Sequence, residues 1–247
     1  MRIAFLTDLH IAGAGETPYG VDVRRNFLNA LAYVKDLHPN VLVLGGDICY
    51  NVGDEAIYQW VNEQITDMPF PVYVIPGNHD DTVMLCEHMR FKHHLQNGEL
   101  YYALPLEGYP GLFLDTSKGE MSETQWNWFK EHLEALRDSN VLVFMHHPPV
   151  RAHVEFMDAK YPFRQSERFL ELIKDLPCHV TALCGHYHVE KWVQRGNLTV
   201  LVTPSLYFQM KQNTEEIVID HYRPAIREFV FDSDGLYSTV HYLESGK

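Results

Sequence analysis

The sequence VIPGNHDD, residues 74–81, sets four polar side chains directly after an apolar run. The run ends at Pro76 and Gly77, and an amide, an imidazole and two carboxylates follow at positions 78–81 without a break. Taken alone, the stretch could be an ordinary turn, because Pro, Gly, Asn and Asp are the common turn residues. Its meaning depends on whether other apolar runs of the chain end in the same way.

Five short apolar runs have the composition of buried strands. They are rich in β-branched residues and continuous rather than alternating, as expected for strands covered on both faces. They occupy residues 3–6, 41–46, 72–75, 141–145 and 180–184. Each precedes side chains that can coordinate a metal ion, namely Asp8 and His10, Asp47, Asn78 with His79, His146 with His147, and His186 with His188. A single such ending means little in a chain with 15 His, but five in this order argue against coincidence.

Helical periodicity lies between these runs, over residues 21–38, 54–66, 122–137 and 166–176. Ser122 and Gln125 form a possible capping box at the start of the third helix. Residues 99–116 read as two strands with a turn, and hairpins around Gly196 and Gly235 follow residue 188. Strand–helix alternation followed by hairpins predicts an α/β sandwich with mixed sheets and helices on the outside.

Composition bounds the class of protein. A chain of 247 residues, 46% of them hydrophobic, can build one large core, and no fixed-period repeat or Gly/Ser-rich linker divides it. We therefore expect one domain over residues 1–247. The formal net charge of −13 argues against binding a nucleic acid polymer along its phosphates. A small phosphorylated substrate remains compatible, because bound metal cations can reverse the local sign of charge.

Cysteine usage and hydropathy indicate the compartment. The four cysteines form no CxxC pair, and Cys49 and Cys184 lie in or beside apolar runs, where we expect buried thiols. The chain shows no signal-peptide pattern, and no apolar run approaches the ~20 residues of a transmembrane helix. We therefore expect a cytoplasmic protein without membrane contact. The sequence does not indicate its oligomeric state.

The five strand ends predict a metal centre, because ligands gather at the carboxyl ends of strands in open α/β sheets. Five ends in one layer would bring together Asp8, His10, Asp47, Asn78, His146, His186 and His188. Two Asp, one Asn and four His are too many for one tetrahedral site, and they suit two divalent ions with one bridging carboxylate. Mixed imidazole and oxygen ligands favour Mn, Fe or Zn.

The motifs D-x-H, G-D, G-N-H-D, H-H-P-P and G-H-x-H, in this order, resemble those of the calcineurin-like metallophosphoesterases. Within that superfamily the chain is similar to the class III cyclic nucleotide phosphodiesterases, a bacterial group that also includes glycerophosphodiesterases. The resemblance covers nearly the whole chain and implies a calcineurin-like four-layer α/β/β/α sandwich with two mixed sheets and flanking helices. Some relatives carry an inserted cap, for which 247 residues leave little room, so we expect an open site.

The resemblance also implies a role for each matching residue. One metal ion would be held by Asp8, His10, Asp47 and His188, and the other by Asp47, Asn78, His146 and His186, with Asp47 as the bridge. His79 matches a non-ligand histidine beside the phosphate, so it would contact the substrate next to Asn78 and act in catalysis with Asp47. His147 would pack nearby or line the rim.

Two further substrate contacts are expected outside the five motifs. Gln209 lies in TPSLYFQ (203–209), where related chains have a similar loop near the site. Arg164, followed by Gln165, stands where family members often carry an Asn among the substrate contacts. Its guanidinium could pair with a phosphate or carboxylate through two hydrogen bonds. The alternative is a surface arginine in the first turn of a helix.

These residues predict a chemistry. Two cations roughly 3.5–4 Å apart lower the pKa of a bridging water, which becomes the nucleophile toward a phosphate. His79 would assist departure of the alkoxide, and Asp80 or Asp81 would orient that imidazole or cap the next helix. We expect a phosphodiesterase for small phosphodiesters, with cyclic nucleotides preferred. The alternatives are a glycerophosphodiesterase or phosphomonoesterase of the same superfamily, and a non-catalytic scaffold such as the retromer scaffold subunit, which the seven filled ligand positions disfavour.

Overall fold

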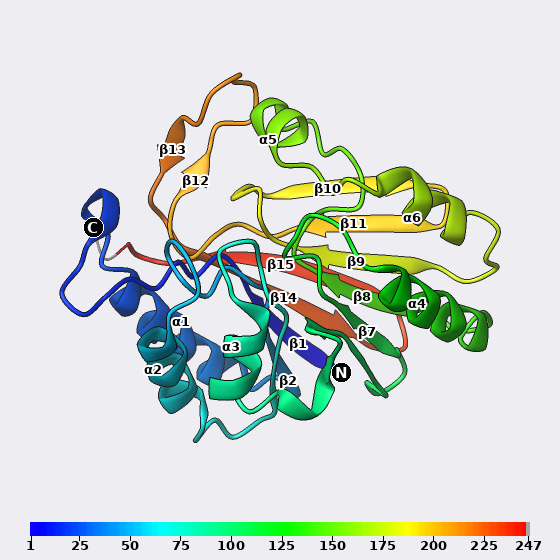
Figure 1. The fold of residues 1–247 in the computed structure, drawn as a ribbon, viewed down its shortest axis with the longest axis horizontal. Coiled ribbons are helices and arrows are strands. Elements are labelled where there is room, and N and C mark those ends of the chain that lie inside the picture. Colours follow the sequence, from blue (N-terminus) through cyan, green and yellow to red (C-terminus); the bar gives the residue numbers. More distant parts are fainter. Residues whose placement is uncertain (246–247) are drawn as a thin grey trace.

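The apolar runs of the sequence form the central strands of two mixed β-sheets that pack face to face (Figure 1). This computed structural model describes residues 1–245. The first sheet has the strand order β15-β14-β1-β2-β3. Its parallel strands are β1 (Arg2–Leu6), β2 (Val41–Leu44) and β3 (Val72–Val74). The predicted C-terminal hairpin adds two antiparallel strands next to β1, β14 (Ala225–Phe231) and β15 (Leu236–Tyr242).

The second sheet has the order β10-β11-β9-β8-β7-β6. Its four inner strands run parallel and are β7 (Gly111–Leu114), β8 (Val141–Met145), β9 (Val180–Cys184) and β11 (Leu198–Val202). The antiparallel strands β6 (Tyr102–Leu104) and β10 (Lys191–Arg195) form its two edges. Two short ladders lie outside the sheets, β4 (Leu95–Gln96) with β5 (Glu99–Leu100), and β12 (Gln209–Met210) with β13 (Ile219–His221).

The five apolar runs are divided between the two sheets, as the resemblance to a two-sheet sandwich implied. Three runs, in β1, β2 and β3, belong to the first sheet, and two, in β8 and β9, belong to the second. Their carboxyl ends nevertheless meet at one edge of the sandwich, where the His186 N–H after β9 donates to Asp8 Oδ2 after β1 at 2.9 Å. A continuous apolar pattern cannot distinguish one sheet from two, because both faces of the strands are covered in either arrangement.

Helices cover the outer faces and complete the four-layer α/β/β/α sandwich (Figure 1). The first sheet carries α1 (Val23–Leu37), α2 (Glu55–Ile65) and α3 (Thr82–His88), and the second carries α4 (Glu123–Ala135) and α6 (Ser166–Ile173). α5 (Glu155–Lys160) lies near the short ladder of β12 and β13, where the Glu155 N–H donates to the Gln212 carbonyl at 3.0 Å (Figure 1). Sequence periodicity missed α3 and α5 because they span two turns or fewer. Two short 3₁₀ turns, Pro18–Gly20 and Lys92–His94, complete the fold.

The predicted capping box of α4 forms only in part. Ser122 caps the helix, since its Oγ accepts a hydrogen bond from the Gln125 backbone N–H at 3.2 Å. The reciprocal contact is missing, because the Gln125 amide accepts from the Asp115 N–H and donates to the Asp115 carbonyl. The Ser122 N–H bonds Glu99 instead. Gln125 therefore ties α4 to the end of β7.

Aromatic rings fill the space between the sheets. Phe5 of β1, Phe113 of β7 and Phe144 of β8 are fully buried, with ring centroids 4.4 Å apart for Phe113–Phe144 and 6.2 Å apart for Phe5–Phe144. All four cysteines are buried and unpaired, as expected for Cys49 and Cys184. Within residues 1–245, no helix is long and apolar enough to span a lipid bilayer.

Candidate metal centre

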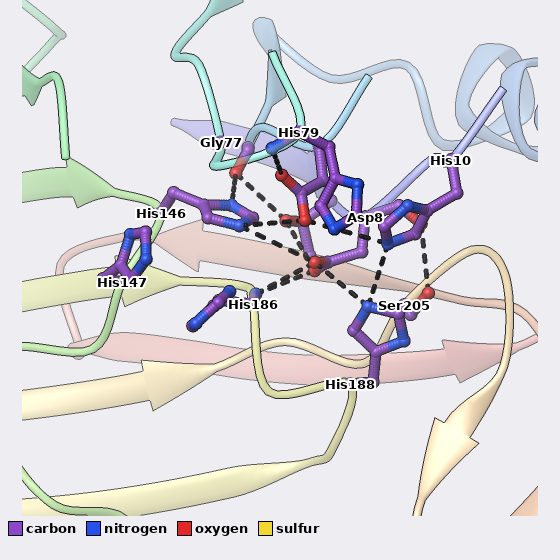
Figure 2. A network of polar contacts seen from close by, with 12 residues as sticks. Asp8, His10, Gly77, His79, His146, His147, His186, His188 and Ser205 are labelled. Atoms are coloured by element: carbon purple, nitrogen blue, oxygen red, sulfur yellow. Dashed lines mark hydrogen bonds and ion pairs between the residues drawn. The ribbon is translucent and has the colours of Figure 1, made fainter. Parts of the chain in front are cut away.

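The side chains that follow the five strands converge on a common centre (Figure 2). Their ligand atoms form two groups, each with all members within 4.8 Å of one another: Asp8, His10 and His188 in one, and Asp47, His146 and His186 in the other. Asp47 lies between the groups, because its Oδ2 is 3.4 Å from His146 Nε2 and 3.8 Å from His10 Nε2. The exposed Asn78 lines the pocket above the same centre.

Five of these residues share an uncommon backbone conformation. Asp8 (φ 52°), His10 (φ 45°), Asp47 (φ 49°), His186 (φ 69°) and His188 (φ 50°) lie in the left-handed region. Asp and His enter this region more readily than most residues, yet it is disfavoured by about 1–2 kcal/mol for a residue with a Cβ. Strain of this kind clusters at functional sites. It indicates that these loops are shaped around the centre and are not ordinary turns.

Hydrogen bonds from neighbouring loops hold the two carboxylates. The His186 N–H donates to both oxygens of Asp8, at 3.1 and 2.9 Å, and the Thr7 hydroxyl donates to Asp8 Oδ2 at 2.9 Å. The His79 N–H donates to Asp47 Oδ1 at 2.8 Å. Asp8 Oδ1 and Asp47 Oδ2 remain directed toward imidazoles, with Asp8 Oδ1 3.3 Å from His188 Nε2.

Backbone carbonyls fix three of the imidazoles. His146 Nδ1 contacts the Gly45 carbonyl at 2.8 Å, His188 Nδ1 the Phe208 carbonyl at 2.9 Å, and His186 Nε2 the Tyr161 carbonyl at 3.0 Å. A carbonyl only accepts, so each of these nitrogens carries the proton and the opposite nitrogen is left for a ligand. Metal-binding histidines usually have such a partner.

The residues present fit a metal ion. His146 Nε2 is buried and has no hydrogen-bond partner within residues 1–245, although it lies 3.4 Å from Asp47 Oδ2 and 3.8 Å from Asp8 Oδ1. A divalent cation bound to this nitrogen and to the carboxylates would satisfy all three groups. The mixture of imidazole nitrogens and carboxylate oxygens suits Mn, Fe or Zn.

Burial keeps two of the imidazoles neutral. It lowers the pKa of His10 to about 3 and the pKa of His186 to about 4. Both imidazoles are therefore uncharged near neutral pH, and the uncharged imidazole is the form that binds metal ions.

The carboxylates favour positive charge at the centre. Burial alone would raise the pKa of Asp8, but the adjacent His188 and His146 lower it to about 2. Burial alone would lower the pKa of His146, but Asp47, together with Asp8, outweighs burial and raises it to about 9. A bound metal ion would supply the same positive charge.

His79 lies beside the centre, at the wall of the pocket. Its Nδ1 contacts the Asn51 carbonyl at 2.9 Å, so Nδ1 carries a proton and Nε2 is available to the pocket. Its ring lies edge-on to His10, with centroids 4.9 Å apart. His79, His10 and Asp47 also form a third group of possible ligand atoms, so the geometry alone permits either a ligand or a catalytic imidazole.

Two glycines let the loops approach the carboxylates. A Cβ added to Gly77 would lie 2.2 Å from Asp47 Oδ1, and one added to Gly185 would lie 2.6 Å from Asp8 Oδ2 and 1.9 Å from Thr7 Oγ1. These distances are below any real Cβ contact. Gly77 and Gly185 therefore allow the loops after β3 and β9 to pack against the carboxylates after β2 and β1.

The two carboxylates that end VIPGNHDD have structural tasks. Asp81 caps α3 by accepting a hydrogen bond from the Met84 N–H at 2.9 Å. Asp80 joins two loops, because it accepts hydrogen bonds from the N–H groups of Ile48, Cys49 and Gly77 and from the Tyr58 hydroxyl. Burial, followed by the charge of Asp47, raises the pKa of Asp80 to about 6. The partner of the His79 imidazole is a backbone carbonyl, so neither carboxylate orients it directly.

Both substrate contacts expected outside the motifs have other partners. The Gln209 amide accepts from the Ser205 N–H and donates to the Ser205 and Arg223 carbonyls, so it holds its own loop together. Arg164 is exposed and bonds Glu120 and the Lys118 carbonyl. Neither residue lines the pocket.

The remaining polar residues of these loops also have structural partners. The Gln165 amide bonds the backbone of Met121 and the indole N–H of Trp126. His147 is buried beside Thr116 and the His186 ring, whose centroid lies 4.0 Å away.

An open pocket of about 330 Å³ lies over the centre. Its floor is formed by the polar residues His10, Asp47, Asn78, His79, His186 and His188. Its walls contain residues that sequence reasoning did not select: Tyr19, Tyr50, Asn51, Met157, Tyr161, Tyr207, Phe208, Met210 and Ile217. The sequence offered two signals, since Tyr50 and Asn51 closely follow Asp47, and Tyr207 and Phe208 lie within TPSLYFQ.

The sequence matches the family described as calcineurin-like phosphoesterase over residues 1–190. The chain belongs to the calcineurin-like phosphoesterases. This family uses divalent metals, and the two clusters of His and Asp side chains could bind them. The predicted fold class is confirmed by the two mixed sheets with outer helices. A solved dimetal phosphatase from Danio rerio has the same fold, with a TM-score of 0.74. It is 12% identical in sequence, and the match covers 99% of this chain and 97% of that one.

Several related calcineurin-like phosphoesterases have names that specify a reaction. A "probable cyclic nucleotide phosphodiesterase" of Fibrobacter succinogenes is 32% identical over 98% of this chain and 94% of its own length. A "probable glycerophosphodiester phosphodiesterase GpdQ" of Arcobacter nitrofigilis is 28% identical, covering 98% and 88%. The "3′,5′-cyclic adenosine monophosphate phosphodiesterase CpdA" of Escherichia coli K12 is 26% identical, covering 98% and 90%. The resemblance to cyclic nucleotide phosphodiesterases expected from the motifs is confirmed.

Proposed function

We propose that the protein is a dinuclear metal-dependent phosphodiesterase that hydrolyses small phosphodiesters and prefers cyclic nucleotides. The observation that carries this proposal is the position of Asp47, whose Oδ2 lies 3.4 Å and 3.8 Å from imidazole nitrogens of two different ligand groups. A carboxylate so placed is suited to bridge two cations, and two-metal sites are typical of phosphate ester hydrolysis. The relatives named as cyclic nucleotide phosphodiesterases support the substrate class.

The proposed ligand sets follow the two groups of side chains. One ion, of the Fe, Mn or Zn type, is held by Asp8, His10, Asp47 and His188, and the second by Asp47, Asn78, His146 and His186. The bound ions would activate water and polarise the phosphoryl oxygens. The protein contributes fixed ligands, because backbone carbonyls hold three of the imidazoles in place.

His79 has the geometry of a general acid. As an imidazolium, it keeps its Nδ1 proton on the Asn51 carbonyl at 2.9 Å and can deliver its Nε2 proton into the pocket. The departing alkoxide oxygen would receive that proton as the P–O bond breaks. Asn78, adjacent in the chain, supplies a neutral amide to the centre and contacts the phosphate.

Glycerophosphodiesters are the second candidate substrates. The relative named GpdQ, which this chain matches over 98% of its length, supports them. The pocket is open, and a direct comparison of rates distinguishes the two substrate classes.

An activity panel on metal-reconstituted protein tests the proposal. It should contain 3′,5′- and 2′,3′-cyclic nucleotides, glycerophosphodiesters and phosphomonoesters, with the Asp47→Asn variant as the control. We expect two ions per chain by elemental analysis, loss of activity on chelation, and the highest kcat/KM for a cyclic nucleotide. Hydrolysis of monoesters alone would exclude the diesterase assignment, and one ion or none in folded, loaded protein would exclude the dinuclear centre.

We further propose that this single domain acts in the cytoplasm, without a nucleic acid polymer or a membrane as its partner. The net charge of −13 and four buried, unpaired cysteines support this setting. Cell fractionation tests the location, and recovery of the protein in the membrane fraction would contradict it.

A further inference from the structure

One wall of the pocket is aromatic from the metal centre to the rim. The Phe208 ring lies 4.8 Å from the His188 ring and 4.6 Å from the Tyr207 ring, by centroid distances. Tyr19 continues the wall outward, 5.9 Å from Phe208 and 6.2 Å from Tyr207. Tyr207 also contacts Tyr50 edge-on at 5.9 Å. We refer to Tyr19, Tyr50, Tyr207 and Phe208 as the aromatic wall.

Tyr19 differs from the rest of the wall in its exposure. Its side chain is 62% exposed, whereas Phe208 is 9% and Tyr207 is 2% exposed. It lies in the 3₁₀ turn Pro18–Gly20 with φ 52°. The Gly20 N–H donates to the Thr17 carbonyl and the Val21 N–H donates to the Pro18 carbonyl, and these two hydrogen bonds hold the turn. A large ring presented to solvent by a strained, hydrogen-bonded turn at the mouth of a pocket is placed to meet a ligand.

Within residues 1–245, no lysine or arginine lines the pocket. Positive charge facing the substrate would therefore come from the metal centre. A substrate with a second phosphate far from the centre would find no partner on the walls. A substrate with one phosphoryl group and a neutral, flat, apolar portion fits both the polar floor and the aromatic wall. Tyr161 and Ile217, 52% and 54% exposed, extend the apolar rim.

We propose that the aromatic wall is a stacking site for the nucleobase of the substrate and that Tyr19 is its specificity-determining residue. This inference rests on the proposed phosphodiesterase function and extends it, because it explains how a cyclic nucleotide is distinguished from a glycerophosphodiester. Stacking does not depend on the reaction at phosphorus, so it stabilises the ground state and the transition state alike. Its loss should raise KM and leave kcat nearly unchanged.

The test compares two substrates that differ only by the base. One is a 3′,5′-cyclic purine nucleotide, and the other is the 3′,5′-cyclic phosphate of methyl ribofuranoside, which has no base. In Tyr19→Ala, kcat/KM for the nucleotide should fall by about 5- to 150-fold, the range of one base–aromatic stack. The value for the base-free substrate should be unchanged, and Tyr19→Phe should retain most of the wild-type rate. Tyr237→Ala, at a tyrosine of β15 that is 51% exposed and outside the pocket, is the matched control.

Binding of the product separates failure of this inference from failure of the proposed function. Adenosine 5′-monophosphate should bind metal-loaded protein more tightly than ribose 5-phosphate, and Tyr19→Ala should remove the difference whether or not the protein is active. Equal losses on both substrates, or no loss on either, would overturn the base-stacking role. Glycerophosphocholine should be assayed in parallel. A loss of kcat/KM in Tyr19→Ala that is confined to this substrate would also overturn base stacking and would assign the aromatic wall to a quaternary ammonium group. Absence of all phosphodiester hydrolysis, with base-dependent binding intact, would overturn only the proposed function.

Discussion

His146 and His147 are neighbours in the chain, but their imidazoles have different surroundings. His146 Nε2 faces both carboxylates of the centre, whereas the His147 ring lies against His186 and near Thr116. His146→Ala should therefore lose one metal ion and most of the activity. His147→Ala should keep two ions, because its ring belongs to neither ligand group. Elemental analysis of both loaded variants is the measurement, and the reverse pattern would show that His147 is the ligand.

His79 should reveal its role through the leaving group. An alkoxide has a high pKa and gains much from a proton delivered in the transition state, whereas nitrophenolate departs readily unaided. His79→Ala should slow hydrolysis of a cyclic nucleotide by ~10²–10⁴-fold and that of bis(nitrophenyl) phosphate much less. Single-turnover rates on protein with both ions bound are needed, so that bond cleavage is compared. Equal losses on both esters would make His79 a phosphate-binding group, and loss of an ion would make it a ligand.

At this scale the sequence indicated which side chains meet at one centre, but it did not indicate the partners of residues that bond to distant backbone. The ligand types could be predicted because each directly follows a strand, and parallel strands deliver their ends to one place. Gln209 could not be assigned, because one of its partners is the carbonyl of Arg223, 14 residues away. The partner of the His79 ring is the backbone carbonyl of Asn51. Every residue has a backbone carbonyl, so residue type could not identify this partner.

Among the elements, the turns after strands are as specialised as the ligands they carry. Gly185 follows β9 and lies so close to Asp8 that a Cβ would be 2.6 Å from Asp8 Oδ2. Gly185→Ala should displace the carboxylate, weaken metal binding and lower activity by about 100-fold, the scale of a 1 Å misplacement. Metal titration and kcat/KM measure the effect.

Gly111→Ala is the matched control for that experiment. Its Cβ would lie 2.9 Å from a terminal methyl of Leu106 and 3.3 Å from two rings of the core, away from the centre. This variant should lose some thermal stability and keep both ions. Normal metal affinity in Gly185→Ala would show that the loop can move away without disturbing Asp8.

The strands were more predictable than their assignment to sheets. The run VLVFM forms β8 over the predicted residues, and α2 falls within its predicted range by one residue at each end. Which runs share a sheet depends on pairing across the chain, as in β11 beside β9, and apolar continuity contains no information on pairing. The capping residue Ser122 was predicted correctly, but Gln125 bonds the end of β7 because tertiary contacts compete with the local box.

For the whole molecule, metal binding should contribute to thermal stability. Each ion that binds only the folded chain, at 100 times its Kd, adds about 2.7 kcal/mol. For a chain of this size 1 kcal/mol corresponds to about 2–4 °C in Tm, so removing two ions should lower Tm by about 10–20 °C. Scanning calorimetry with and without a chelator measures the shift. A Tm that is the same after complete metal removal would show that the centre is not coupled to folding, and His146→Ala should show a smaller shift than the wild type.

The left-handed backbone of the ligand residues predicts the outcome of a saturation mutagenesis screen scored by protein abundance. At Asp8, His10, Asp47, His186 and His188, glycine should be tolerated better than alanine, because only glycine adopts positive φ without a Cβ penalty. The order should reverse at His146 and Asn78, which are absent from the positive-φ residues of the described chain, since alanine there loses less conformational entropy. The relative abundance of the glycine and alanine variants in cells would thus report the backbone conformation at each ligand position. Alanine ranked above glycine at all seven positions would contradict the strained loops.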